Sequence, residues 1–106
     1  MVKRGEIWLA KLDPKIGSEI QKTRPCVIIS PPEMHDWLRT ALIAPMTSGS
    51  RPASYRVPVS FEGRDGLILL DQMRAVDKSR LVKRLDALDI RTLQATLAVL
   101  RQVFSE

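Results

Sequence analysis

Prolines, glycines and other turn residues divide the first 85 positions of this 106-residue chain into short apolar runs. Strands of about five residues fit such runs, whereas a helix needs a longer periodic segment. The pattern changes only near the C-terminus, where apolar residues recur at intervals of three and four. The sequence therefore predicts several short strands and then one helix, arranged as an antiparallel, barrel-like sheet that the helix closes or covers.

The boundaries of the expected strands are set largely by proline, which fixes φ and lacks the N–H that a strand ladder needs. We expect Pro14 to end the first strand, Pro25 to precede the second and Pro45 to end the third. Alternation of apolar and polar residues at 55–59 indicates an edge strand, and the turn-like segment 62–65 precedes another run. The expected strands are 6–12, 26–29 (buried on both faces), 40–44, 55–59, 66–70 and 80–85.

The last segment has the period of an amphipathic helix from residue 89 onward. Asp89 is the expected N-cap, because its carboxylate accepts hydrogen bonds from the first free amides and favours the positive end of the helix dipole. The apolar stripe is expected to belong to the core, and a contribution to a subunit contact stays open. The stripe consists of Ile90, Leu93, Leu97, Leu100 and Phe104.

Length and apolar content bound the class of protein. A core built from 106 residues supports one domain, residues 1–106. No apolar run approaches the roughly 18 residues that cross a bilayer, and the N-terminus lacks the apolar segment of a signal peptide, so we expect a cytoplasmic protein with no membrane partner. With only Cys26 and His35 of their types, no zinc site and no cofactor are expected. His35 is expected to be a surface or packing residue.

The charge and the polar segments direct attention to the ends of the strands. The net charge of +5 is spread along the chain and favours a polyanionic partner, either nucleic acid or an acidic protein. The common phosphate-loop, dinucleotide, zinc-protease and serine-hydrolase motifs are absent from the sequence. Polar residues instead cluster where a barrel would bring its loops together, at 13–19, 22–25, 45–50 and 70–74.

The order and wording of these segments resemble the MazF/PemK (Kid) family of bacterial toxin endoribonucleases over nearly the whole chain. The matching pieces are RGEIWL with LDP at 4–14, Gly17-Ser18-Glu19 with Thr23-Arg24-Pro25, Pro45-Met46-Thr47-Ser48, and GLILLDQ at 66–72. The resemblance implies a compact SH3-like antiparallel β-barrel with a C-terminal helix, forming a homodimer. It also implies an acidic antitoxin protein as partner, and inhibition of translation and growth as the effect.

The implied reaction is sequence-specific cleavage of single-stranded RNA, including mRNA, without a metal. The 2′-hydroxyl acts as nucleophile and leaves a 2′,3′-cyclic phosphate and a 5′-hydroxyl end. The resemblance points to Arg24 and Thr47 as the catalytic pair, and a guanidinium is well suited to grip phosphate oxygens. Asp71 and Glu19 are candidates for acid/base or orienting roles. Candidate RNA contacts are Ser18, Lys22, Thr23, Ser48, Arg51, Tyr55 and Gln72.

Two positions depart from the Kid branch of the family. That branch carries an arginine two residues before the aspartate that corresponds to Asp71, where this chain has Leu69, and a histidine where this chain has Ser18. The role of Asp71 therefore stays open between a general base and a structural or RNA-contacting residue. Trp37 and Tyr55 are candidates for stacking on bases, whereas Trp8 is expected in the core.

The sequence leaves two other functions open. The chain could be a gyrase-inhibiting toxin that shares the barrel, or a non-catalytic nucleic-acid-binding barrel, because fold does not fix function. The RNA motif that is cut depends on loops around 13–23 and 47–56, whose conformations the spacing does not specify.

Overall fold

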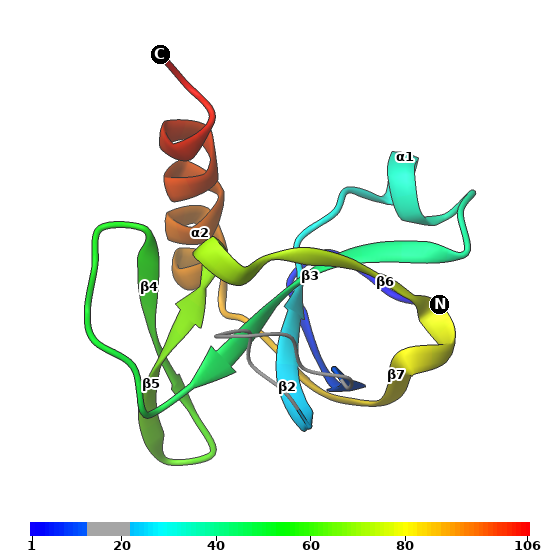
Figure 1. Cartoon of the computed structure of the whole chain (residues 1–106), viewed down its shortest axis with the longest axis horizontal. Coiled ribbons are helices and arrows are strands. Elements are labelled where there is room, and N and C mark those ends of the chain that lie inside the picture. Colours follow the sequence, from blue (N-terminus) through cyan, green and yellow to red (C-terminus); the bar gives the residue numbers. More distant parts are fainter. Residues whose placement is uncertain (13–21) are drawn as a thin grey trace.

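The computed structural model describes residues 1–12 and 22–106, and its strands form one antiparallel sheet with a long helix after it (Figure 1). This arrangement confirms the predicted mainly β fold with a C-terminal helix. The strands are β1 (Glu6–Lys11), β2 (Thr23–Ile28), β3 (Thr40–Thr47), β4 (Arg56–Phe61), β5 (Arg64–Leu69), β6 (Arg74–Asp77) and β7 (Leu81–Ala87). The helices are α1 (Pro32–His35) and α2 (Ile90–Val103), with 3-10 turns at Leu70–Gln72 and Lys78–Arg80.

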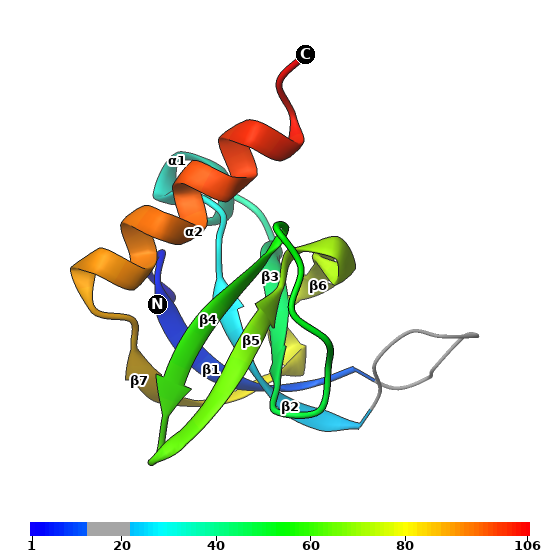
Figure 2. The same ribbon diagram turned by 90° about the vertical axis from the view of Figure 1, so that its left-hand side faces the viewer.

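The sheet has the strand order β4-β5-β3-β2-β1-β7, and β6 pairs with β3 beside this path. It curls strongly, so that β4 and β5 lie to one side and β6 and β7 to the other (Figure 1). Figure 2 shows α2 crossing over the strands, with the C-terminus extending beyond them. The position of β4 at one end of the order confirms that the 55–59 run forms an edge strand. The expected strand at 80–85 is present as β7, which pairs with β1.

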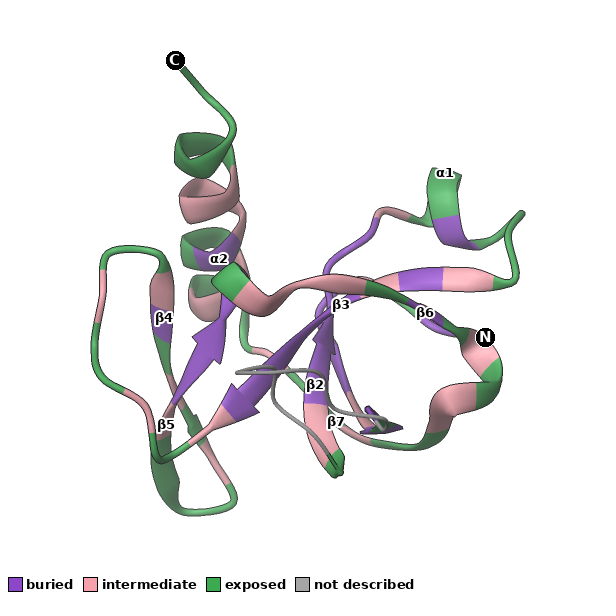
Figure 3. Cartoon of the chain, in the orientation of Figure 1, coloured by how far each residue is buried: buried purple, intermediate pink, exposed green. Residues whose placement is uncertain are grey.

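Both faces of the central strands are buried, which confirms the expectation for the CVII run. Cys26 and Ile28 belong to one apolar cluster with Leu12 and Ile43. Val27 and Ile29 point the other way, into a second cluster, against which Val99 and Leu100 of α2 pack. Figure 3 shows the buried positions concentrated on β2, β3 and β5. The sheet is therefore the common wall of two cores, which fixes the direction of each side chain along β2 and β3.

The prolines do not bound β2 and β3 as predicted, and both boundary predictions were wrong. Pro25 lies inside β2, opposite Leu9 of β1, because the ladder from β2 to β3 begins only at Cys26. Pro45 lies inside β3, because β3 changes neighbours there: it pairs with β6 through Ile43 and with β5 from Met46. A residue without an N–H is tolerated where no ladder needs it. β2 thus begins three residues earlier than predicted, at Thr23, and β3 ends three residues later, at Thr47.

The hairpin between β4 and β5 turns more tightly than predicted. Phe61 pairs with Arg64, so that Glu62 and Gly63 alone form the loop, with φ of 52° and 76°. Two positive φ values in a two-residue loop are typical of the turn that matches the twist of a hairpin. Arg64 and Asp65, expected in the turn, therefore belong to β5.

Helix α2 begins as predicted but buries less of its stripe. The Asp89 carboxylate accepts a hydrogen bond from the backbone N–H of Thr92 at 2.7 Å, which confirms the N-cap. The stripe, in contrast, is exposed at its ends, with Ile90 65% and Phe104 72% exposed, because the sheet covers only the middle turns. Over the two described ranges, no helix is both long and apolar enough to cross a bilayer.

Candidate active site

Arg24 and Thr47 are brought together by the register of β2 and β3. Cys26 lies opposite Pro45 and Val27 opposite Ala44. Arg24 lies two residues before Cys26 and Thr47 two residues after Pro45, so both residues lie just beyond the same end of this ladder. The two short motifs that resemble the toxin family, RP and PxT, therefore lie beside each other at one end of the β2–β3 pair.

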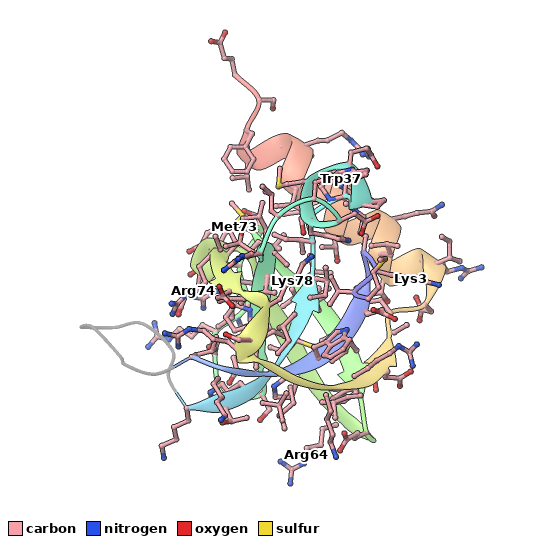
Figure 4. All side chains as sticks on the ribbon, turned by 90° about the vertical axis from the view of Figure 1, so that its right-hand side faces the viewer. Lys3, Trp37, Arg64, Met73, Arg74 and Lys78 are labelled. Atoms are coloured by element: carbon pink, nitrogen blue, oxygen red, sulfur yellow. The ribbon has the colours of Figure 1, made fainter. Side chains whose placement is uncertain are left out.

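Both residues line one surface pocket of about 180 Å³. Two sides of the pocket are formed by β2 and the end of β3, and the third side is the β4–β5 hairpin, which contributes Phe61 and Arg64. Figure 4 shows Arg64 projecting outward at the lower edge of the molecule. The complete lining is Arg24, Pro25, Met46, Thr47, Ser48, Val59, Phe61, Arg64, Asp65 and Gly66. Two guanidinium groups and two hydroxyls beside apolar carbons fit a phosphodiester together with its sugar.

The position of Thr47 is fixed on two sides. Its Oγ1 accepts a hydrogen bond from the backbone N–H of Gly49 at 3.2 Å, so the hydroxyl proton can be donated to a ligand. On the other side, a Cβ placed on Gly66 would lie 2.8 Å from the Thr47 carbonyl oxygen. Only glycine at this position allows β5 to approach the end of β3 so closely.

Cys26 supports Arg24 from the core and is not a nucleophile. Its Sγ lies 3.5 Å from the Arg24 carbonyl oxygen, as donor to that acceptor. Burial raises the pKa of the Cys26 thiol to about 12, although the charges of Arg24 and Arg74 act in the opposite direction. Because reactivity requires the thiolate, this buried thiol is inert at neutral pH.

Asp71 belongs to a second cluster beside the pocket. Arg56, which the sequence analysis did not single out, donates from Nε and Nη2 to the two Asp71 carboxylate oxygens at 3.1 and 2.9 Å. Its Nη1 donates to the Arg51 carbonyl oxygen at 3.0 Å, and its guanidinium lies 5.7 Å from the centre of the Tyr55 ring. Hydrogen bonding by Arg56 lowers the pKa of Asp71, although partial burial opposes the shift. Asp71 is therefore held as a carboxylate.

The remaining predicted residues are distributed around these two clusters. Ser48 lines the pocket, whereas Gln72 lies in the 3-10 turn after β5. Lys22 has a φ of 71° and its carbonyl accepts from the Leu12 N–H at 3.0 Å. Thr23 is the exposed first residue of β2. The predictions for Ser18 and Glu19 lie outside the described residues.

The aromatic and histidine predictions have mixed outcomes. Trp37 is 85% and Tyr55 42% exposed, so both rings are accessible for stacking. Trp8 is only half-buried, and its Nε1 donates to Glu6 Oε1 at 3.1 Å. His35 is fully buried, with Nδ1 2.8 Å from Ser30 Oγ, which makes it a packing residue and excludes the surface alternative.

Three charged residues of the two clusters were missed: Arg56, Arg64 and Asp65. Each acts across strands, so no short motif contains it together with its partner. The dipeptide Glu62-Gly63 was the usable signal. Its interpretation as a two-residue hairpin loop would have placed Arg64 and Asp65 on a strand beside β3.

The fold and the pocket define a small, basic, antiparallel barrel protein whose site combines cationic and hydroxyl side chains suited to a nucleic-acid backbone. Residues 3–104 match the family described as PemK-like, MazF-like toxin of type II toxin-antitoxin system. The chain belongs to this family. It is 40% identical over 91 residues to Endoribonuclease PemK from Escherichia coli, covering 80% of this chain and 68% of that protein.

Solved structures share the fold. The crystal structure of MazF from Deinococcus radiodurans superposes with a TM-score of 0.83 at 22% identity, covering 96% of this chain and 94% of the other. An endoribonuclease in complex with its cognate antitoxin, from Mycobacterial species, gives a TM-score of 0.80 at 16% identity, covering 96% and 93%. At these identities the likeness concerns the fold alone.

Proposed function

We propose that this protein is the toxin of a type II toxin-antitoxin system and a metal-independent endoribonuclease that cuts single-stranded RNA at specific short sequences. The 2′-hydroxyl loses its proton to a base and attacks the adjacent phosphorus, the bond from phosphorus to the 5′-oxygen breaks, and the leaving 5′-oxygen takes up a proton. The products therefore carry a 2′,3′-cyclic phosphate and a 5′-hydroxyl. The observation that carries this proposal is that Arg24 and Thr47 line one pocket. Cleavage of mRNA then stops translation and growth.

The pocket residues divide the work of the reaction. Negative charge develops on the non-bridging phosphate oxygens, and Arg24 grips these oxygens with a permanently charged fork of donors. Thr47 donates its hydroxyl proton to the same phosphate, and Ser48 adds a second hydroxyl contact. Arg64 attracts the neighbouring phosphate from the hairpin. These contacts strengthen as charge builds up, which is the condition for catalysis rather than mere binding.

We assign the proton-accepting role to Asp65. Among the described residues it is the one carboxylate that lines the pocket. Asp71 is less suited to proton transfer, because its two oxygens are held by Arg56 and its pKa is lowered. Of the roles that the sequence left open for Asp71, we therefore assign an orienting role and not that of the base. Glu19 stays a prediction as an orienting residue for Arg24.

The same proposal includes the partners. A subunit with a net charge of +5 attracts RNA and an acidic antitoxin by long-range steering. The exposed apolar ends of the α2 stripe support a homodimer, because a lone subunit would leave these side chains in water. We place the protein in the cytoplasm, where it would meet both mRNA and the antitoxin.

The test uses purified protein, a long single-stranded RNA and excess EDTA, followed by mapping of the product ends. Discrete cuts with cyclic phosphate and 5′-hydroxyl ends are the expected result. Intact RNA in the presence of a folded protein would refute the proposal and would leave gyrase inhibition or nucleic-acid binding without catalysis as the function. A supercoiling assay with gyrase separates these two outcomes.

Single substitutions test the assignment of the residues. Arg24→Ala, Thr47→Ala and Asp65→Asn should each lower kcat/KM by roughly 100-fold or more, because each removes a contact to the reacting groups. Matched controls are Arg91→Ala on α2 and Thr40→Ala at the opposite end of β3, which should cleave normally. Near-normal cleavage by a pocket variant with an unchanged Tm removes that residue from the site.

A further inference from the structure

The guanidinium of Arg56 has binding capacity that the fold does not use. A guanidinium carries five N–H donors. Three of them are engaged, two by the Asp71 carboxylate and one by the Arg51 carbonyl oxygen. Within the described part of the chain, two N–H donors have no partner, one on each terminal nitrogen. The Arg56 side chain is 18% and the Asp71 side chain 30% exposed, so a ligand can reach the pair from solvent.

The chemistry around these donors favours a nucleobase over a phosphate. Asp71 neutralises the charge of Arg56, which weakens attraction for a phosphate but leaves the direction of the two donors intact. The exposed Tyr55 ring lies against the same guanidinium, 5.7 Å from ring centre to carbon, and offers a face for stacking. An aromatic face beside a fixed pair of donors is the combination that recognises an unpaired base.

The base must present two neighbouring acceptors to satisfy both donors. Guanine does so with O6 and N7, the usual partners of a bidentate arginine. Cytosine does so with O2 and N3. In adenine and uracil every acceptor on these edges neighbours a donor, so one N–H of Arg56 would stay unpaired and desolvated.

The register of the sheet places this pair near the pocket but not in it. Leu67 of β5 lies opposite Thr47, and Leu69, two residues further along β5, lies opposite Arg56. Two strand spacings and two residue rises separate the Thr47 and Arg56 backbones by roughly 12 Å before twist. A base bound at Arg56 therefore belongs to a nucleotide close to the cleaved bond.

We propose that Tyr55, Arg56 and Asp71 form a base-reading subsite that selects guanine or cytosine at one fixed position beside the cleavage site. This proposal rests on RNA cleavage by the Arg24–Thr47 pocket. Asp71 acts as a positioning residue, which holds the guanidinium plane, and Arg56 reads the base edge. This role would explain why the Arg56–Asp71 pair is held so firmly at the surface, with both Asp71 carboxylate oxygens and three Arg56 N–H groups in hydrogen bonds.

The experiment compares the cut sites of the wild-type protein and of Arg56→Ala on one long RNA, read by sequencing of the 5′-hydroxyl ends. The wild type should require guanine or cytosine at one position near every cut. Loss of a bidentate contact should lower discrimination at that position by roughly 5- to 150-fold, while cutting continues and selection elsewhere stays the same. Arg56→Lys keeps the charge and should lose the same discrimination, which tests the proposal if Arg56→Ala folds poorly.

Modified RNA identifies the base. If guanine is selected, 7-deazaguanine at that position should slow the wild type but not Arg56→Ala, and 3-deazacytosine should do so if cytosine is selected. The salt dependence of RNA binding should stay unchanged in Arg56→Ala, whereas loss of a phosphate contact would reduce its slope by about one. A reduced slope, or an unchanged cut pattern in both Arg56 variants, overturns the subsite. Absence of any cleavage by the wild type overturns the proposed function instead.

Discussion

Replacement of Gly66 by alanine should disable the site without unfolding the protein. The new Cβ would lie 2.8 Å from the Thr47 carbonyl oxygen and 3.3 Å from its carbon, whereas ordinary contacts begin at 3.4 Å. The end of β3 must therefore move by about 0.6 Å. Overpacking of this kind costs about 1–3 kcal/mol, with a fall in Tm of about 4–8 °C for each kcal/mol. Because Thr47 moves with its backbone, kcat/KM should fall by roughly 10- to 100-fold.

A matched variant separates displacement of Thr47 from loss of stability. Gly63 has a φ of +76°, and none of the described atoms lies within 4 Å of a Cβ added there. Gly63→Ala should cost about 1–2 kcal/mol through backbone strain alone and leave cleavage unchanged. Thermal unfolding and cleavage of one RNA are measured for both variants. Wild-type cleavage by Gly66→Ala would refute the inference that the close strand contact positions Thr47.

Three further predictions concern charge and burial. The lowered pKa of Asp71 means that its pair with Arg56 stabilises the fold above the ordinary value of 3.8 and loses this effect as pH falls through the folded-state pKa. The Tm difference between wild type and Asp71→Asn should therefore shrink in acid, and a pH-independent difference would contradict this. Cys26, with a pKa raised from 9.0 to about 12, should react with a thiol reagent only as the protein unfolds, and its burial should lower stability as pH rises between those values. Asp89→Ala should lower the Tm by removal of the helix cap, whereas Asp89→Asn, which keeps an acceptor for the Thr92 N–H, should not.

The fold was predictable where local periodicity determines it. Alternating and continuous apolar runs identified six strands, and the three-to-four spacing with Asp89 identified α2. The ends of β2 and β3 were not predictable, because Pro25 and Pro45 stop a strand only if a neighbouring strand needs their N–H. That condition depends on which strands pair at each residue, and a single chain does not show it. The exposed ends of the α2 stripe have the same cause, since burial depends on how far the sheet extends beneath the helix.

The sequence motifs identified the residues that β2 and β3 contribute to the pocket, but not those that the β4–β5 hairpin contributes. Arg24 and Thr47 lie at neighbouring ends of β2 and β3, and both line one pocket. Arg64, Asp65 and Gly66 reach the same pocket only through pairing of β5 with β3. Gly66 shows this most clearly. The sequence shows a glycine at this position, but it does not show that the Thr47 carbonyl oxygen lies too close for any larger residue.

Leu69 is the position where comparison along the sequence gives the wrong impression. The Kid branch of the family carries an arginine there, two residues before the aspartate, so in comparison with that branch the chain lacks a cation beside Asp71. In the structure, β4 supplies this cation. Arg56 lies directly opposite Leu69 and donates two hydrogen bonds to Asp71. The Arg56 guanidinium also contacts two groups of the segment just before β4, the Tyr55 ring and the Arg51 carbonyl oxygen. In the subsite proposed above, this arrangement supplies both the donors and the aromatic face that read the base.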